Sequence, residues 1–299
     1  MKEQAYFLHA LSPLHAGVGT AADIVDLPIA RMQATGIPIV PGSSIKGVLR
    51  DACSPGENGK AEEKEKWLAA FGPEQEEASR HAGAIVVGDA RLLALPVRSF
   101  KGTFAWVTSP LLLRLAARDM QASMKDLPVI PQPDQNAALV ADNPGILVKA
   151  CGHIYLQDID IPASTDSKTT DWAVTLARLL FPENEDEQQH FVSHFALVDD
   201  EIMTFLWETA TQVDTRVRID PGTGVVAQGA LWLEESLPPE TVLIGLMAAD
   251  RARRKFDKLK NWGSPDDVMA YALGGEKILQ FGGKATVGRG RCRILHGRA

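Results

Sequence analysis

Apolar and polar positions along this 299-residue chain follow two periods, one typical of strands and one typical of helices. Two-residue alternation or short apolar runs predict strands at residues 5–11, 37–40, 84–88, 146–150, 153–161, 215–219, 225–234, 241–249 and 291–295. Apolar residues three or four positions apart predict helices at residues 43–53, 61–71, 110–120, 169–181, 187–208 and 266–273. Strands and helices interleave with few long parallel crossovers, which favours an α+β fold with a ferredoxin-like βαββαβ core and insertions.

Turn and capping residues divide these elements. Ser43 or Ser44 is expected to cap the helix that ends near residue 53, because a hydroxyl accepts from free amides of the first turn. The turn at residues 220–224, DPGTG, joins two strand-like stretches into a hairpin. Residues 127–145 contain four prolines, which predicts a mobile surface loop.

Composition places the chain among globular proteins with a sizeable core, since 45% of its residues are hydrophobic and 23% charged. Its longest apolar runs, within residues 84–88 and 241–249, are too short to cross a bilayer, and no signal-peptide pattern opens the sequence. A cytoplasmic location is therefore expected. Cys53, Cys151 and Cys292 are widely spaced and predict neither a disulfide framework nor a paired metal knuckle.

The net charge of −7 argues against a generic nucleic-acid binder, but its distribution is uneven. Residues 277–299 contain six Lys or Arg and no acid, and residues 251–260 contain six more against one aspartate. Acidic residues concentrate instead at residues 74–77, 183–187 and 199–201. A surface with one basic and one acidic face follows, although residues 251–260 alone are equally consistent with a solvated helix face.

A candidate anion site opens the helix at residues 43–53. The strand at residues 37–40 runs into a Pro-Gly turn and then into Ser43, Ser44 and Lys46, with Arg50 one turn further on the same face. Free amides and the helix dipole favour an anion at such a helix start. An ordinary cap beside a solvated lysine is the alternative.

A second candidate anion site lies near the C-terminus, in the sequence FGGKATVGRGRCR of residues 281–293. It lacks the GxxxxGK[ST] pattern of a P-loop. Glycines let a sugar-phosphate backbone approach closely while the interleaved cations contact phosphates, although a flexible turn has the same composition. The residues concerned are Gly282, Gly283, Lys284, Gly288 and Arg289. Two such elements at opposite ends of one chain predict a grip on a polyanion, most simply RNA.

Candidate catalytic and base-contacting residues lie in the first loop and in the hairpin. His15 is followed by Gly17 in a loop, and Asp26 lies two residues before a proline. By pattern alone, Asp26 is typical of a turn residue and His15 of a structural or exposed histidine. In the hairpin, Arg216 and Arg218 share one face. Trp232 on the returning strand either stacks on a base or packs.

Taken together, five stretches resemble the RAMP superfamily of CRISPR proteins. They are LSPLHAGVG (residues 11–19), DIVDLPIAR (23–31), PGSSIKGVLR (41–50), the hairpin (215–235) and the C-terminal glycine-rich stretch (281–293). FKGTFAWVTSP at residues 100–110 adds to the likeness. RAMP proteins are RNA-recognition-like modules of effector complexes. The position of DIVDLPIAR is similar to that in the repeated backbone subunits of type III-B complexes.

The resemblance implies a single RAMP domain, with a palm at residues 1–126 and 241–299 and an inserted helical and thumb region at about 127–240. It also implies head-to-tail self-association along a guide RNA, next to other subunits of the effector complex. The thumb hairpin, with Arg216, Arg218 and Trp232, would break the guide–target duplex at regular intervals. Complementary target RNA would be cleaved there with help from Asp26.

The same resemblance assigns the guide RNA to the two anion sites and the chemistry to the first loop. Asp26 is predicted to bind a divalent metal ion, Mg or Mn, only with target RNA bound, since a carboxylate can bind such an ion or position a 2′-hydroxyl. His15 is the acid–base candidate, and Asp23 ranks behind Asp26. Two alternatives stay open: a non-catalytic structural guide-binding subunit, and a stand-alone guide-RNA-processing endoribonuclease that uses His15.

Overall fold

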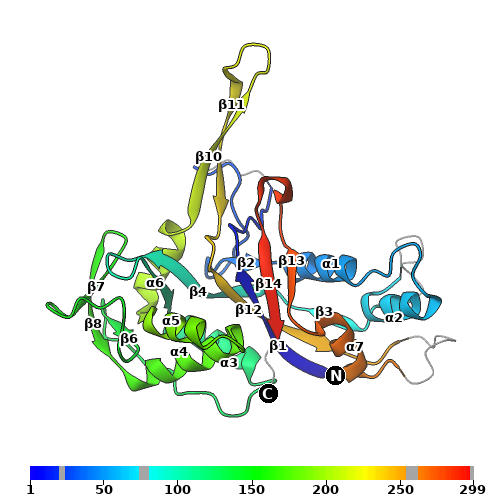
Figure 1. Cartoon of the computed structure of the whole chain (residues 1–299), viewed down its shortest axis with the longest axis horizontal. Coiled ribbons are helices and arrows are strands. Elements are labelled where there is room, and N and C mark those ends of the chain that lie inside the picture. Colours follow the sequence, from blue (N-terminus) through cyan, green and yellow to red (C-terminus); the bar gives the residue numbers. More distant parts are fainter. Residues whose placement is uncertain (20–23, 74–80, 254–261, 297–299) are drawn as a thin grey trace.

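The computed structural model describes residues 1–19, 24–73, 81–253 and 262–296 (Figure 1). It is a mixed α+β structure built on a 12-stranded mixed sheet, with a separate two-stranded hairpin. The strands are β1 (Lys2–Ala10), β2 (Ile39–Val40), β3 (Ile85–Val87), β4 (Ala90–Arg98), β5 (Phe104–Thr108), β6 (Ala138–Val140), β7 (His153–Leu156), β8 (Ile159–Thr165), β9 (Phe195–Val198), β10 (Gln212–Ile219), β11 (Val226–Ser236), β12 (Val242–Ala249), β13 (Lys277–Gln280) and β14 (Arg291–His296). The helices are α1 (Gly42–Ala52), α2 (Ala61–Phe71), α3 (Pro110–Met120), α4 (Ser167–Leu180), α5 (Glu185–Ser193), α6 (Asp200–Thr209) and α7 (Pro265–Leu273), with a 3₁₀ turn at Ala285–Val287.

Four strands in the order β14-β1-β12-β4 form the centre of the sheet, and each adjacent pair is antiparallel. Alternation along β1 divides its side chains between two cores. Tyr6 and Leu8 are in the core that includes residues of α1 and α7, whereas Ala5 and Phe7 are in the core that includes residues of α3 and α4. Both faces of the sheet are therefore covered. Figure 1 shows α1, α2 and α7 on one side of the molecule and α3–α6 on the other.

The sheet continues from β4 through β5-β9-β6-β8-β7, and here two predictions were wrong. Residues 187–208 were expected to form one helix, but β9 interrupts them and pairs in parallel with β5. Residues 127–145 were expected to be a surface loop, but β6 lies between β8 and β9. Both strands are buried and only three or four residues long, so their periodicity is too short to identify.

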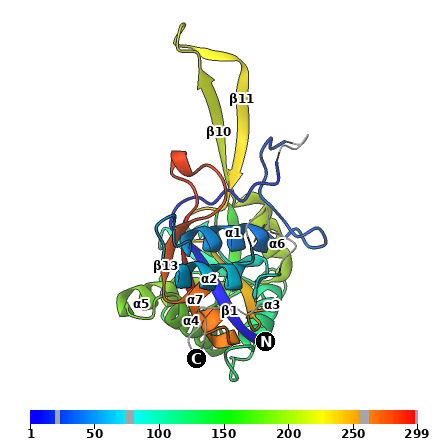
Figure 2. The ribbon, with the colours of Figure 1, turned by 90° about the vertical axis from the view of Figure 1, so that its right-hand side faces the viewer.

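The predicted hairpin is present as β10 and β11, which project from the body of the molecule (Figures 1 and 2). Directly paired residues of an antiparallel ladder share a face. Val217 pairs with Leu231, and these side chains are 44% and 64% exposed, so this face of the hairpin is apolar and open. Arg216 pairs with Trp232 on the opposite face. The register shifts between Val217 and Ile219, which leaves Arg218 outside the regular ladder.

Most other predicted elements are confirmed, but the start of α1 differs from the prediction. Its N-cap is Pro41, and neither serine caps it, so the capping prediction for Ser43 or Ser44 was wrong. The amide of Gly42 donates instead to a carboxylate oxygen of Asp89, at 2.8 Å. The first amide of this helix is therefore already bound by a carboxylate of the protein itself. The strand expected at residues 146–150 is replaced by turns before β7. The single strand expected at residues 153–161 is divided by a turn at residues 157–158 into β7 and β8, and β13 was not anticipated.

Within the described ranges, none of the helices combines the length and apolar character needed to cross a membrane. The three cysteines are free. The division into a palm and an inserted region stays a prediction.

Candidate functional site

The first loop of the chain runs along the base of the hairpin and is held there by backbone hydrogen bonds. Leu27 donates to the carbonyl of Leu233 at 3.1 Å, and Glu235 donates to the carbonyl of Leu27 at 3.0 Å. Further back, Leu14 and Leu237 exchange two hydrogen bonds of 2.8 and 2.9 Å. The loop therefore behaves as an added strand whose position is fixed by β11.

Asp26 lies at the point where this loop meets β11. Its Oδ2 atom accepts a hydrogen bond of 2.7 Å from the amide of Leu233, and the residue is otherwise exposed. A carboxylate held by one oxygen keeps its second oxygen available to a ligand. The alternative candidate, Asp23, lies outside the described residues.

His15 is nearly buried and is oriented by the same strand. Its Nδ1 atom lies 2.6 Å from the carbonyl oxygen of Glu235. Because a carbonyl only accepts, Nδ1 donates this hydrogen bond, and in the matching tautomer Nε2 is the ring nitrogen that can accept a proton. Nε2 faces Gly17, where an added Cβ would lie only 2.5 Å away. Gly17, two residues after His15, therefore provides the space that the imidazole occupies.

The C-terminal loop, residues 281–290 between β13 and β14, closes the other side of the same region. Gly283 donates to the carbonyl of His15 at 2.9 Å, and Gly290 donates to that of Pro13 at 2.8 Å. Gly282 has φ +72°, and a Cβ there would lie 2.3 Å from the His15 carbonyl oxygen. Both views of the molecule show the two loops at the base of the hairpin (Figures 1 and 2). The two sequence motifs that lie farthest apart thus meet here.

Charged side chains of the hairpin and the C-terminal loop pair across this junction. Arg289, which is 4% exposed, forms an ion pair with Asp214 of β10. Lys284 lies 3.4 Å from Glu234 of β11, and Arg216 lies 3.8 Å from the same carboxylate. Burial acts to raise the pKa of Asp214, but hydrogen bonds from Arg289 and Gln212 outweigh it, so that pKa is lowered. Three of the predicted cations, Arg289, Lys284 and Arg216, thus lie beside protein carboxylates.

Glu235 anchors the DIVDLPIAR segment, a role that the sequence did not reveal. One of its oxygens accepts from the amide of Ile29 at 3.0 Å, and the other accepts from Arg31 at 2.6 Å. Arg31 also donates to the carbonyls of Gly36 and Trp207. This buried carboxylate fixes the loop that carries Asp26. In the sequence, Glu234 and Glu235 are marked only as the pair of glutamates that ends GALWLEE, residues 229–235.

The predicted guide-binding residues of α1 lie in a different setting. Ser43 and Ser44 are exposed. Lys46 donates to the carbonyl of Ile85 at 2.9 Å, and burial, followed by the charge of Arg50, lowers its pKa. Arg50 donates to the carbonyls of residues 71–73 and lies over the Trp67 ring, 4.3 Å from its centroid. The contacts of Arg50 are those of a residue that joins α1 to α2, and its role toward the guide stays a prediction.

The remaining predicted residues differ in exposure. Arg218 and Gly288 are exposed, and Gly288 has φ +79°. Trp232 is partly buried, and its indole nitrogen is buried with no hydrogen-bond partner in the described part of the chain. These residues lie on the hairpin and the C-terminal loop, next to the site.

A resident metal ion is not supported by the residues present. Among the residues that the structure describes, no three His, Cys, Asp or Glu side chains come together as ligands. Asp26 offers a single exposed carboxylate, and the nearby Glu235 is fully engaged. The protein side chains alone therefore do not fit a metal centre.

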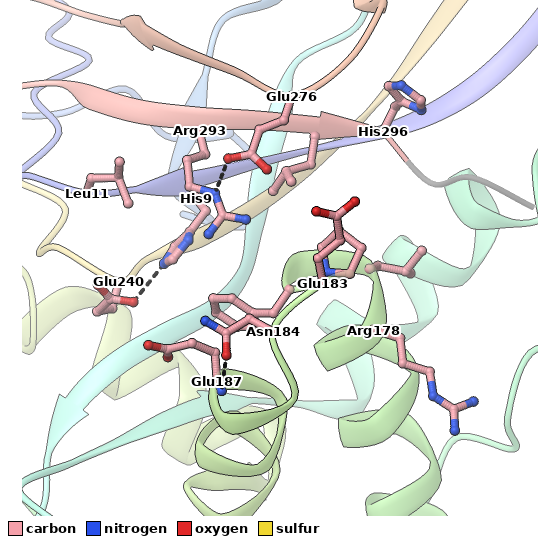
Figure 3. A pocket seen from close by; sticks show the side chains of 14 residues that line it. His9, Leu11, Arg178, Glu183, Asn184, Glu187, Glu240, Glu276, Arg293 and His296 are labelled. Atoms are coloured by element: carbon pink, nitrogen blue, oxygen red, sulfur yellow. Dashed lines mark hydrogen bonds and ion pairs between the residues drawn. The ribbon is translucent and has the colours of Figure 1, made fainter.

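A cavity of about 660 Å³ lies elsewhere, between β14 and the α4–α5 connection (Figure 3). In it, His9 pairs with Glu240 at 2.7 Å, and Arg293 pairs with Glu276 at 3.0 Å. Four glutamates and two arginines line it, and none of the predicted site residues does. Its excess of carboxylates disfavours a phosphate-bearing ligand.

This chain belongs to the RAMP superfamily, because the model of that family matches residues 7–293. Among individual proteins, it is 34% identical over 295 residues to the CRISPR system Cmr endoribonuclease Cmr4 of Pyrococcus furiosus. That match covers 98% of this chain and 95% of the relative. The resemblance found in the sequence is confirmed.

Solved structures of related proteins are also similar to this chain. The crystal structure of oligomeric Cmr4 from Pyrococcus furiosus has a TM-score of 0.71 and 26% identity, covering 100% of this chain and 99% of the other. A chain in the cryo-EM structure of the type III-B Cmr-beta complex bound to cognate target RNA has a TM-score of 0.72 and 18% identity, covering 98% and 96%. The second likeness shows a shared fold.

Proposed function

We propose that this protein is the backbone subunit of a type III-B CRISPR (Cmr) ribonucleoprotein. It binds guide RNA along a head-to-tail filament and cleaves complementary target RNA at regular intervals. Nearly full-length similarity to an endoribonuclease of this system and to an oligomeric crystal structure supports the assignment. The observation that carries it is the convergence of Asp26, His15 and the C-terminal loop at the base of one hairpin.

The finer fold assignment belongs to the same proposal. The strand order β14-β1-β12-β4, antiparallel throughout and crossed by α1 and α7, supports a ferredoxin-like palm. The hairpin β10–β11 is the proposed thumb. Its open apolar face, with Val217 and Leu231, supports a wedge between stacked bases, since apolar side chains can separate base steps at modest cost.

The residues at the hairpin base suit cleavage by the RNA's own 2′-hydroxyl. In this proposal Nε2 of His15 accepts the 2′-hydroxyl proton while the 2′-oxygen attacks the adjacent phosphorus. The new 2′-O–P bond replaces the bond to the 5′-oxygen, which leaves with a proton from solvent. Asp26 positions the attacking ribose. A 2′,3′-cyclic phosphate and a 5′-hydroxyl result.

The divalent ion, Mg or Mn, stays a proposal for the RNA-bound complex alone. Asp26 would supply one carboxylate ligand, and phosphate oxygens would supply others. When bound, such an ion would stabilise charge on the phosphate. A cytoplasmic location likewise remains a prediction.

The decisive experiment compares wild type with Asp26→Asn in the guide-loaded complex, using labelled complementary RNA with magnesium or manganese. Asparagine keeps an oxygen for the Leu233 amide, so the loop should stay in place. Evenly spaced products that disappear in Asp26→Asn, with guide binding unchanged, support the proposal. Unchanged products would contradict it and favour a structural subunit. Cleavage of unpaired repeat RNA by an isolated monomer, lost in His15→Ala, would favour a processing enzyme.

A further inference from the structure

Glu234, at the base of the hairpin, is a buried carboxylate whose oxygens lack close hydrogen-bond partners within the described residues. Its side chain is 2% exposed, and its Oε2 atom lies 3.4 Å from Nζ of Lys284 and 3.8 Å from Nε of Arg216. Charge-assisted hydrogen bonds are about 2.8 Å long, so both contacts are longer than a full charge-assisted hydrogen bond. Its other oxygen, Oε1, is buried and lacks a hydrogen-bond partner within the described residues. The carboxylate therefore attracts two cations without fully binding either.

The neighbouring ion pair between Asp214 and Arg289 is of a different kind. The two side chains are in direct hydrogen bond, and the Arg289 side chain is 5% exposed. Breaking this pair would leave a buried guanidinium unpaired, which is costly. Arg289 therefore joins the C-terminal loop to the hairpin and is poorly placed to leave Asp214 for a ligand.

Lys284 and Arg216 are available to a ligand where Arg289 is not. Each side chain is 35% exposed, while Glu234 beneath them is covered. Long basic side chains can turn their charged ends toward solvent while the carboxylate stays in place. A phosphate at the surface can thus compete directly with Glu234 for the same two cations.

We propose that Glu234 is an internal competitor of RNA phosphate for Lys284 and Arg216. This inference rests on the proposed function, because it assumes that RNA lies against this face. In the free protein the carboxylate attracts both cations. When RNA binds, its phosphates take them, and Glu234 is left buried with fewer partners. Each subunit therefore grips RNA less tightly than its cations alone would allow.

Such competition disfavours short or incidental polyanions. A short polyanion contacts one subunit and must overcome the competition with few other contacts. A guide that spans several subunits gains from each of them, so the added contacts raise its avidity. Specificity for the long guide then arises from a built-in unfavourable contribution at every subunit.

The test measures affinity of the purified protein for a labelled, unstructured oligoribonucleotide at fixed salt. Glu234→Gln should tighten binding about two- to fivefold, the range expected when one partly screened ion pair is removed. Lys284→Gln should weaken binding. In the double variant the gain from Glu234→Gln should shrink markedly, because its main partner is gone. Unchanged or weaker binding by Glu234→Gln, or an equal gain without Lys284, would overturn the inference.

Glu276→Gln is the matched control, since it makes the same charge change at the distant Arg293 pair and should alter affinity less than twofold. Thermal unfolding identifies variants that fail to fold. If Glu234→Gln fails, Glu234→Met removes the same charge with a side chain of similar length. A wild-type protein that binds no RNA, alone or in the complex, would reject the proposed function itself. Binding that depends on Lys284 but gains nothing from Glu234→Gln would reject this inference alone.

Discussion

The amide of Leu233 donates a 2.7 Å hydrogen bond to the carboxylate of Asp26, across 207 residues of sequence. The candidate nuclease aspartate is thus held by the returning strand of the hairpin. His15 is held by the same strand two residues further on, through the carbonyl of Glu235. Successive strand residues are about 3.3 Å apart, so β11 fixes the spacing of the two groups. A hairpin displaced by bound RNA would carry the site with it.

The position of His15 can be tested at a neighbouring residue that does not itself titrate. In Gly17→Ala the new methyl group would lie 2.5 Å from Nε2, and the ring is buried and bonded on its other side. The imidazole must shift, and a displacement near 1 Å costs catalysis on the order of 100-fold. Target cleavage by the assembled complex should fall by about that factor while guide binding stays unchanged. Cleavage at the wild-type rate would exclude His15 from the chemistry.

Gly47→Ala is the matched glycine substitution for that experiment. Gly47 lies inside α1, and no atom lies within 4 Å of an added Cβ. Alanine is favoured over glycine inside a helix by up to about 1 kcal/mol, so the free energy of unfolding should rise slightly. Cleavage should not change. A comparable loss in both variants would point to a general effect on assembly.

Lys46 should contribute to RNA binding in a manner that depends on pH. Burial, followed by the charge of Arg50, lowers the pKa of Lys46 below that of an ordinary lysine, 10.5. Its charge is therefore lost earlier as pH rises, and affinity for guide RNA should fall on the alkaline side. Lys46→Gln should weaken binding to every guide sequence similarly and reduce the salt slope by about 0.7. A salt slope equal to wild type would exclude Lys46 as a phosphate ligand.

Arg50 should affect stability more than RNA binding. Its guanidinium donates to three consecutive carbonyls and lies over Trp67, a geometry that a lysine cannot reproduce. Arg50→Lys keeps the charge, and the free energy of unfolding should drop by about 1–3 kcal/mol. Affinity for RNA at a temperature where the variant is folded should match wild type. A selective loss of affinity would support the sequence-based prediction that Arg50 binds the guide.

The sequence predicted elements that are defined by local signals. The helix expected at residues 61–71 is α2, with Gly72 at its end, and the hairpin followed from alternation on either side of a DPGTG turn. β9 was missed because its four buried residues lie between two helices, although Asp199, which caps α6, marked the break. The pairing of Glu234 with Lys284 could not be predicted from the sequence, because residues 50 positions apart come into contact only through the fold.

Asp214 should link the stability of the hairpin base to pH. The pKa of its carboxyl is lowered below the ordinary 3.8: burial acts to raise it, but hydrogen bonds from Arg289 and Gln212 prevail. A carboxyl with a lowered pKa in the folded state stabilises the protein above its unfolded pKa, and this contribution is lost as pH falls through the folded pKa. Asp214→Asn removes the negative charge that compensates the buried guanidinium of Arg289 and should lower the free energy of unfolding by about 3 kcal/mol at pH 7.

The pH dependence distinguishes this effect from a general packing defect. Denaturant unfolding of wild type and Asp214→Asn should differ most at neutral pH. The difference should narrow as pH falls below 3.8 and through the lower pKa of the folded carboxyl. Asp266→Asn serves as control, because its exposed pair with Lys2 should contribute little at any pH. A difference for Asp214→Asn that stays constant from pH 7 to pH 3 would mean that the destabilisation comes from altered packing and that the charge of Asp214 beside Arg289 does not stabilise the fold.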